Sequence, residues 1–218
     1  DFYVNLILGL SLAQQSKHQE AEKYLKKSTI LNPTDITALS AYGFTLNQLK
    51  ENDKAIFYLK QALEIEPDDV QLIGTLAMIY NGMQSYEISD SLYERALELK
   101  PDDPLINNNY SYAFATRKIQ LERALKMVQI SIAADSLNSS YLDTIGWVHF
   151  MLGNYKEAKL YLEKAIEVGG ESAVMLDHLA DTESKLGNKE RAIELWKNSL
   201  KLDPTKIEIQ NKIDKGAI

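Results

Sequence analysis

The chain has 218 residues, 45% of them hydrophobic and 25% charged, which excludes the composition of a disordered protein. With 24 Lys and Arg against 31 Asp and Glu its net charge is −7, which argues against nucleic acid as a main partner because phosphate binding needs clustered cations. The absence of cysteine excludes disulfides and cysteine-ligated zinc, and no apolar run approaches the roughly 20 residues of a membrane span.

The N-terminal segment, residues 2–12, is strongly apolar, but it lacks the basic start and the cleavage site of a signal peptide. The chain also begins at Asp1 without methionine. We therefore expect a fragment or a processed form, in which Phe2, Val4 and Ile7 packed against a preceding unit.

Four prolines reveal an internal repeat. Pro33, Pro67 and Pro101 are 34 residues apart, and Pro204 lies 103 residues further on, one more than three such periods. When the chain is divided into six units and each is numbered from its first residue, these prolines fall at position 32 of the first, second, third and sixth, and Gly170 takes that position in the fifth. These units are residues 2–35, 36–69, 70–103, 104–138, 139–172 and 173–206, and the fourth has one extra residue.

Small and large residues alternate at fixed positions of the repeat. Position 8 is small in every unit: Gly9, Gly43, Ala77, Ser111, Gly146 and Ala180. Position 24 is bulky in every unit: Leu25, Leu59, Tyr93, Val128, Leu162 and Trp196. Two helices approach closely only where a small side chain faces the neighbour and a large one fills the adjoining hollow, so each unit is predicted to be a helix pair.

The second unit illustrates the elements in chain order. Apolar residues at spacings of 3 and 4 predict a first helix over about residues 36–49 and a second helix through residues 55–63, separated by a polar turn. Proline at 67 ends the second helix, and Asp69 is placed to cap the next one. We therefore expect an all-α solenoid over residues 1–206, followed by a polar capping helix over residues 207–218.

These positions resemble the tetratricopeptide repeat, whose pattern is W-x2-L-G-x2-Y, then A-x3-F, then P. The resemblance covers residues 2–206 and is best in residues 42–67 and 145–165, although position 4 lacks tryptophan and position 11 becomes His149 and Glu183. Residues 141–147 and 176–181 look like those of long bacterial members, many of them exported. The resemblance thus suggests a bacterial protein of the cytoplasm, the periplasm or the cell envelope.

The resemblance implies a right-handed superhelix and a scaffold that binds a peptide or protein in its concave groove. Position 9, which typically touches the ligand, holds large apolar or aromatic residues in the first five units and an aspartate in the sixth. The candidate groove residues are Phe44, Asn47, Met78, Asn81, Asn108, Tyr112, Asp143, Trp147, Asp177 and Asp181.

The expected ligand is a protein or peptide with apolar side chains. Asn and Gln side chains of the groove would form hydrogen bonds with the backbone of this ligand. Asp143, Asp177 and Asp181 further suggest a Lys or Arg on the partner. Two alternatives stay open: the aromatic residues belong to the core between helices, or the acids only complement helix dipoles. The basic residues with which some family members grip a C-terminal carboxylate are absent from the corresponding positions.

No catalytic, cofactor or metal site is predicted. His18, His149 and His178 are far apart and outside any HExxH spacing, and the glycines form neither GxGxxG nor a P-loop. His178 with two neighbouring aspartates is weaker as a metal site than as a surface histidine, and His149 is expected to pack between helices. Two other functions stay open: a structural segment of a larger, catalytic or exported polypeptide, and a self-assembling solenoid of undetermined oligomeric state.

Overall fold

The computed structural model describes residues 1–216 and 218, and these residues contain helices and no strand. The helices form two compact parts, each of several repeat units: Asp1–Pro101 and Asp102–Ile218. Their bounds are α1 (Phe2–Gln14), α2 (His18–Leu31), α3 (Ile36–Gln48), α4 (Asn52–Ile65), α5 (Val70–Gly82), α6 (Tyr86–Leu99), α7 (Pro104–Arg117), α8 (Leu121–Ala134), α9 (Ser139–Met151), α10 (Tyr155–Gly169), α11 (Ala173–Lys185), α12 (Lys189–Leu202) and α13 (Ile207–Lys215).

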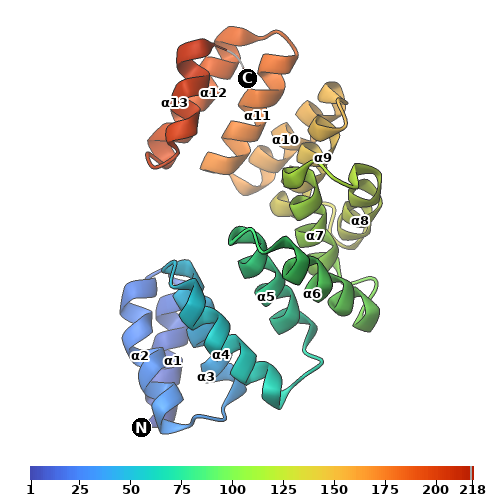
Figure 1. Ribbon diagram of the computed structural model, residues 1–218. Helices are drawn as coiled ribbons and strands as arrows, with labels where there is room; N and C mark the ends of the chain where they lie inside the picture. The colour runs from blue at the N-terminus through green and yellow to red at the C-terminus, as the bar shows by residue number, and fades with distance from the viewer. Residues whose placement is uncertain (217) are drawn as a thin grey trace. The chain divides into compact units, whose positions relative to one another are not determined.

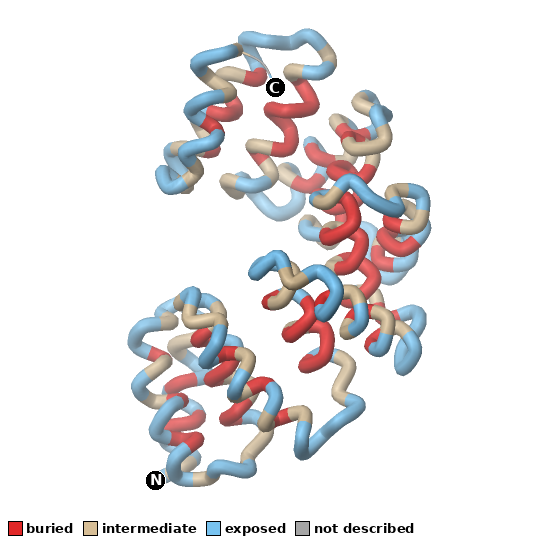
Figure 2. The backbone as a smooth tube through the Cα atoms, viewed as in Figure 1, coloured by how far each residue is buried: buried red, intermediate tan, exposed pale blue. Residues whose placement is uncertain are grey.

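The chain is an all-α solenoid of helix pairs, as the repeat predicts (Figure 1). In residues 1–101 the pairs are α1 with α2, α3 with α4 and α5 with α6. In residues 102–218 they are α7 with α8, α9 with α10 and α11 with α12, and α13 packs against α12. Within each unit the buried positions lie where helices meet (Figure 2). Among the described helices, none combines the length and the apolar character that crossing a bilayer requires.

The close approach of paired helices depends on position 8. A methyl group on Gly43 would lie 2.7 Å from Leu59 Cγ, and one on Gly146 would lie 2.7 Å from Leu162 Cγ. Leu59 and Leu162 occupy position 24 and are fully buried or nearly so. The predicted match of small against large residues is therefore confirmed at these helix pairs.

Serine replaces glycine or alanine at some small positions without leaving a polar group unpaired. The Ser89 hydroxyl donates to the Ala77 carbonyl oxygen across the α5–α6 pair, at 2.8 Å. The Ser111 hydroxyl donates to the Ala124 carbonyl oxygen across the α7–α8 pair, also at 2.8 Å. Each buried hydroxyl is satisfied by the neighbouring helix, so a small polar residue is tolerated there.

Side chains cap the first helix of each pair. Asp69 accepts hydrogen bonds from the backbone N–H groups of Gln71 and Leu72, at 2.8 and 3.0 Å, as its position after Pro67 predicts. Asp35 caps α3 in the same way through Ala38 N–H, at 2.8 Å. Capping satisfies donors that have no partner inside the helix and fixes where the helix begins.

The extra residue of the fourth unit lies in the turn between α7 and α8. The corresponding turns of the other five units each contain one left-handed residue, for example Lys50 at φ 65° and Gly153 at φ 82°. The α7–α8 turn contains two, Lys118 at φ 57° and Gln120 at φ 47°. The insertion is absorbed in the turn, and Ala124, the small residue of α8 that contacts Ser111, comes one residue later than the corresponding residues of the other units.

His149 packs between the helices of its pair. Its ring lies parallel to that of Tyr161 in α10, with centroids 5.5 Å apart, and its Nδ1 is buried with no hydrogen-bond partner among the described residues. Burial lowers the pKa of His149, against the opposing influence of Glu157. The histidine thus takes the place of an aromatic residue between helices.

Gly43→Ala tests the close approach of α3 and α4. The clash with Leu59 should outweigh the gain of about 1 kcal/mol in helix propensity and lower the free energy of unfolding by about 1–3 kcal/mol, measured by urea denaturation. Gly82→Ala is the matched control, because a methyl group there meets no atom within 4 Å, and it should not destabilise the chain. Equal effects of the two changes would contradict this packing.

His149→Phe tests the buried imidazole. Because the folded-state pKa is lowered, the neutral ring is favoured, and its contribution to stability is lost as pH falls below the ordinary value of 6.5. Removing the unpaired nitrogen should raise the unfolding free energy at pH 7 by about 1 kcal/mol. The variant should also lose less stability than wild type between about pH 7 and pH 5. Urea titrations at both pH values measure this, and an unchanged pH dependence would contradict it.

Candidate functional site

The position 9 side chains of residues 1–101 are accessible. Leu10 of α1, Phe44 of α3 and Met78 of α5 are 37%, 42% and 37% exposed. α3 packs against both α1 and α5, so these three helices form one inner layer. Three large apolar side chains on this layer therefore contact solvent, which costs free energy unless a partner covers them.

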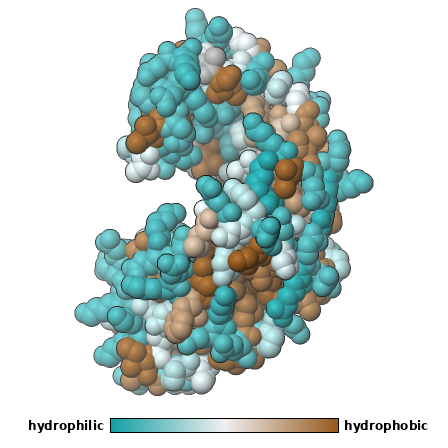
Figure 3. Space-filling model, viewed as in Figure 1, coloured by the Kyte–Doolittle hydropathy of each residue, from teal (hydrophilic) through white to brown (hydrophobic). Residues whose placement is uncertain are grey.

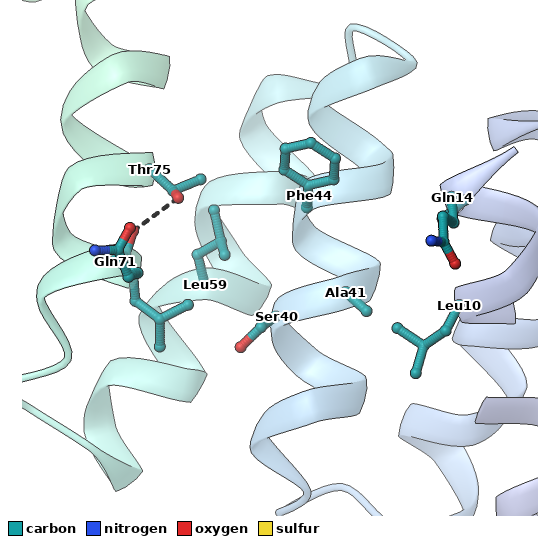
Figure 4. A pocket seen from close by; sticks show the side chains of 10 residues that line it. Leu10, Gln14, Ser40, Ala41, Phe44, Leu59, Gln71 and Thr75 are labelled. Atoms are coloured by element: carbon teal, nitrogen blue, oxygen red, sulfur yellow. Dashed lines mark hydrogen bonds between the residues drawn. The ribbon is translucent and has the colours of Figure 1, made fainter. Parts of the chain in front are cut away.

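A hollow of about 400 Å3 lies between the first helices of the three pairs. Leu10 and Phe44 line it, with Ala41 between them on α3 and Thr75 of α5 beyond Phe44 (Figure 4). Leu59 of α4 lies behind this layer. The complete lining is Leu10, Ala13, Gln14, Ser40, Ala41, Phe44, Leu59, Gln71, Leu72 and Thr75.

The lining carries no charged residue, and its hydroxyl groups are already bonded within their own helices. The Thr75 hydroxyl donates to the Gln71 carbonyl oxygen at 2.8 Å, as Figure 4 shows, and the Ser40 hydroxyl donates to the Ile36 carbonyl oxygen at 2.6 Å. The hollow thus presents mainly carbon. Its volume is that of a small-ligand pocket or of a site for a few side chains of a peptide.

The two asparagines that were predicted to line the groove in residues 1–101 are half-buried on the inner layer. Asn47 lies on α3 and Asn81 on α5, each three residues after the position 9 residue of its helix. The Asn81 side-chain oxygen is buried and has no hydrogen-bond partner among the described residues. Because this oxygen is buried, the Asn81 side chain would have to turn before the oxygen could accept a hydrogen bond from a bound peptide.

The side chains at position 9 are covered to a greater extent in residues 102–218. Tyr112 is half-buried, whereas Trp147 and Asp181 are only 9% and 6% exposed. Burial, and after it the charge of Asp143, raises the pKa of Tyr112 to about 12. The expectation that Trp147 and Asp181 offer accessible groove side chains is therefore not met in this structure.

Trp147 is covered by an aromatic stack. Its ring lies on His178 of α11, with centroids 4.0 Å apart and planes 14° apart, and on Phe150, with centroids 4.7 Å apart. His178 is buried, with Nδ1 2.9 Å from Asp143 Oδ1 of α9, so it is not the surface histidine that the sequence suggested. Asn108, on α7, is also buried, and its side-chain oxygen has no partner among the described residues.

Asp177 and Asp181 are paired within the chain. Lys212 of α13 places Nζ 2.7 Å from Asp177 Oδ1 and 2.7 and 2.8 Å from the two oxygens of Asp181. Asp181 Oδ1 also accepts a hydrogen bond from Trp196 Nε1 at 2.9 Å. The predicted place for a partner's Lys or Arg is thus occupied by a lysine of this chain.

Burial and charge act in opposite directions on this cluster. Burial raises the pKa of the Asp181 carboxyl, and the nearby Lys212 ammonium opposes that rise. Burial alone would lower the pKa of Lys212, but the charge of Asp181 and the hydrogen bonds to both carboxylates outweigh it and raise the pKa. Lys212 therefore stays protonated at neutral pH, and the contact is an ammonium with its carboxylates.

The residue at position 6 of the following unit helps to determine whether position 9 is open, although the half-buried Tyr112 has the small Thr144 there and lies near His178 instead, with ring centroids 6.1 Å apart. Small residues, Ala41 and Thr75, stand at position 6 beside Leu10 and Phe44. The large His178 lies on Trp147, and Lys212 binds Asp181. Position 6 played no part in our prediction of the groove, although its residues can be compared in the sequence: Ile7, Ala41, Thr75, Asn109, Thr144 and His178.

Metal chemistry gains no support from the histidines. Within residues 1–216 and 218, no three His, Asp or Glu side chains are arranged to hold a metal ion. His178 makes a pair with Asp143 alone, and Asp177 and Asp181 turn to Lys212. The chemistry of this cluster is that of internal ion pairs and hydrogen bonds.

Comparisons with solved structures find the same fold at low sequence identity. One chain of the APC/C hetero-tetramer Cut9–Hcn1 is 17% identical with a TM-score of 0.88, over 99% of this chain and 43% of that one. A tetratricopeptide repeat protein from Parabacteroides merdae is 17% identical with a TM-score of 0.79, over 99% and 84%. PilW, a type IV pilus biogenesis factor, is 20% identical with a TM-score of 0.75, over 96% and 97%.

Family models described as tetratricopeptide repeat match this chain over most of its length. The matched ranges are residues 12–79, 70–103, 139–171 and 173–206. They include the helix pairs whose close approach is described above. This chain belongs to the tetratricopeptide repeat family.

Proposed function

We propose that the hollow of residues 1–101 binds an apolar segment of a partner protein, with Leu10 and Phe44 as its main contacts. The chain is a helical-repeat scaffold of a kind that binds proteins and is typically not catalytic. The observation that carries the finer proposal is the uncharged hollow between Leu10, Ala41, Phe44 and Thr75.

Burial of apolar surface supplies the driving force. At about 25 cal/mol per Å2, covering on the order of 300 Å2 would contribute roughly 7 kcal/mol before the cost of association. Leu10, Phe44 and Met78 are exposed large side chains that could contribute this area. A partner with two or three apolar side chains at helical or alternating spacing would suit the row.

Polar groups would orient the bound segment. Gln14 and Gln71 belong to the lining of the hollow, and Asn47 and Asn81 lie on the same inner layer. Their amides can donate to and accept from a peptide backbone. Because Asp177 and Asp181 are engaged by Lys212, this proposal does not require a basic residue on the partner.

Self-assembly is a second candidate, favoured by the exposed apolar face of α1. Tyr3, Val4 and Ile7 are exposed on this helix. Apolar residues gathered on one helix face favour contact with another helix. Sedimentation over a hundredfold range of concentration tests this candidate, and a constant monomer mass would contradict it.

Phe44→Asp tests the hollow. Peptides selected on the wild-type chain from a phage-displayed library of 16-residue sequences should be rich in apolar residues. They should bind the Phe44→Asp variant at least tenfold more weakly, because a charge replaces the main apolar contact. Fluorescence anisotropy measures the affinity, and circular dichroism checks the fold.

Phe57→Asp is the matched control, because Phe57 is 56% exposed on α4 and is not in the hollow. It should bind the peptides like wild type. Equal loss in both variants, or equal retention, would place binding elsewhere.

Ala41→Leu tests the hollow in the opposite way, by filling it. Ala41 is half-buried between Leu10 and Phe44, so a larger side chain there should occupy the space without entering the core. We expect unchanged thermal unfolding and at least tenfold weaker peptide binding. Unchanged binding by a folded Ala41→Leu variant would show that the hollow is not the site.

A further inference from the structure

The contact between α13 and α11 repeats a contact made one unit earlier. Asp143 of α9 pairs with His178 of α11, and Asp177 of α11 pairs with Lys212 of α13. Both pairs join residues 35 apart, from position 5 of one unit to position 6 of the next. α13 therefore lies where the first helix of a seventh unit would lie, and it is held by the same kind of contact between an acidic and a basic side chain.

α13 is weakly attached compared with the helices before it. It has nine residues, against 13 to 15 in the helices before it. Ile209 is its one buried residue, whereas Ile207 is 74% exposed. Helices of this length are marginal in water by themselves, so α13 depends on what Ile209 and Lys212 contact.

The surface under α13 has the chemistry of a helix-docking site. Asp177 and Asp181 lie one turn apart on α11 and both bind the Lys212 ammonium. Trp196 of α12 donates to Asp181 and lies under Lys212, whose Nζ is 6.0 Å from the ring centroid. Ile209 and Lys212 are three residues apart, so one helix face carries both an aliphatic residue and a cation.

The outer surface of this end does not resemble a recognition patch. In the space-filling view the visible surface over α12 and α13 is mostly hydrophilic (Figure 3). The groups that could recognise a helix are two carboxylates and an indole. Lys212 of α13 bonds to the two carboxylates and lies over the indole ring.

We propose that α13 is an internal ligand that covers a helix-docking site on α11 and α12, and that a partner helix takes this site when α13 leaves. The partner helix carries an aliphatic residue three positions before a lysine or arginine. This site is separate from the hollow of residues 1–101, so either proposal can fail without the other.

The test uses a fluorescein-labelled peptide with the sequence of residues 204–218 as the probe. The full-length variant Ile209→Asp/Lys212→Ala, in which α13 is released, should bind this peptide at least tenfold more tightly than wild type, where α13 competes. A peptide carrying Lys212→Glu should not bind the released variant, because it would place a third carboxylate against Asp177 and Asp181.

The matched control is the full-length variant Ile207→Asp/Lys215→Ala. It makes the same chemical changes at exposed positions of α13 and should bind the peptide as weakly as wild type. No binding by a folded released variant would overturn the proposal. Equal binding by wild type and the released variant would overturn it as well.

Hydrogen exchange on the wild-type chain decides the matter if the released variant does not fold. Amides of α13 should exchange at least tenfold faster than those of α11 and α12, because α13 opens locally. Equal protection of the three helices would show that α13 is a fixed part of the fold, and it would overturn the proposal.

Discussion

The structure depends on the contact between a small residue at position 8 and a large one at position 24 of each repeat. Where Gly43 meets Leu59, the two helices are so close that no methyl group fits between them. This contact fixes how the first helix is rotated within its pair. The next residue, at position 9, is then turned by about 100° around the helix, off the face that meets the partner helix. Core packing and the presentation of a binding surface are thus two consequences of one constraint.

Whether that surface is open depends on the neighbouring first helix. In residues 1–101 the adjacent position 6 residues are Ala41 and Thr75, which are too small to cover Leu10 and Phe44. In residues 102–218 His178 stacks on Trp147, and Lys212 neutralises Asp181. The same backbone pattern therefore gives an apolar hollow in residues 1–101 and a buried network of rings and ion pairs in residues 102–218.

The fold could be predicted from the sequence because its determinants are local and periodic. Pro67 and Asp69 mark a helix boundary by themselves, and the small residue at position 8 recurs in every unit. The insertion could be placed from the sequence between Ser111 and Val128, because Val128 is displaced by one residue and Ser111 is not, but the left-handed conformations of Lys118 and Gln120 could not be predicted from the repeat positions.

The site could be predicted only in part. Phe44 and Met78 are accessible, as position 9 suggests, but exposure of a side chain depends on neighbours that are distant in sequence. Trp147 is covered by His178, and Asp181 is bonded by both Trp196 and Lys212. The position of a residue in the repeat pattern cannot represent these contacts, since each joins different helices.

Photo-cross-linking would show which helices contact a bound peptide. A peptide selected on this chain, with a benzophenone side chain in place of one apolar residue, would be cross-linked to the chain and the attachment sites found by mass spectrometry. We expect attachment to α1, α3 and α5, around Leu10, Phe44 and Met78. Attachment to α9 and α11, or to the outer face of α4 around Phe57, would contradict this expectation.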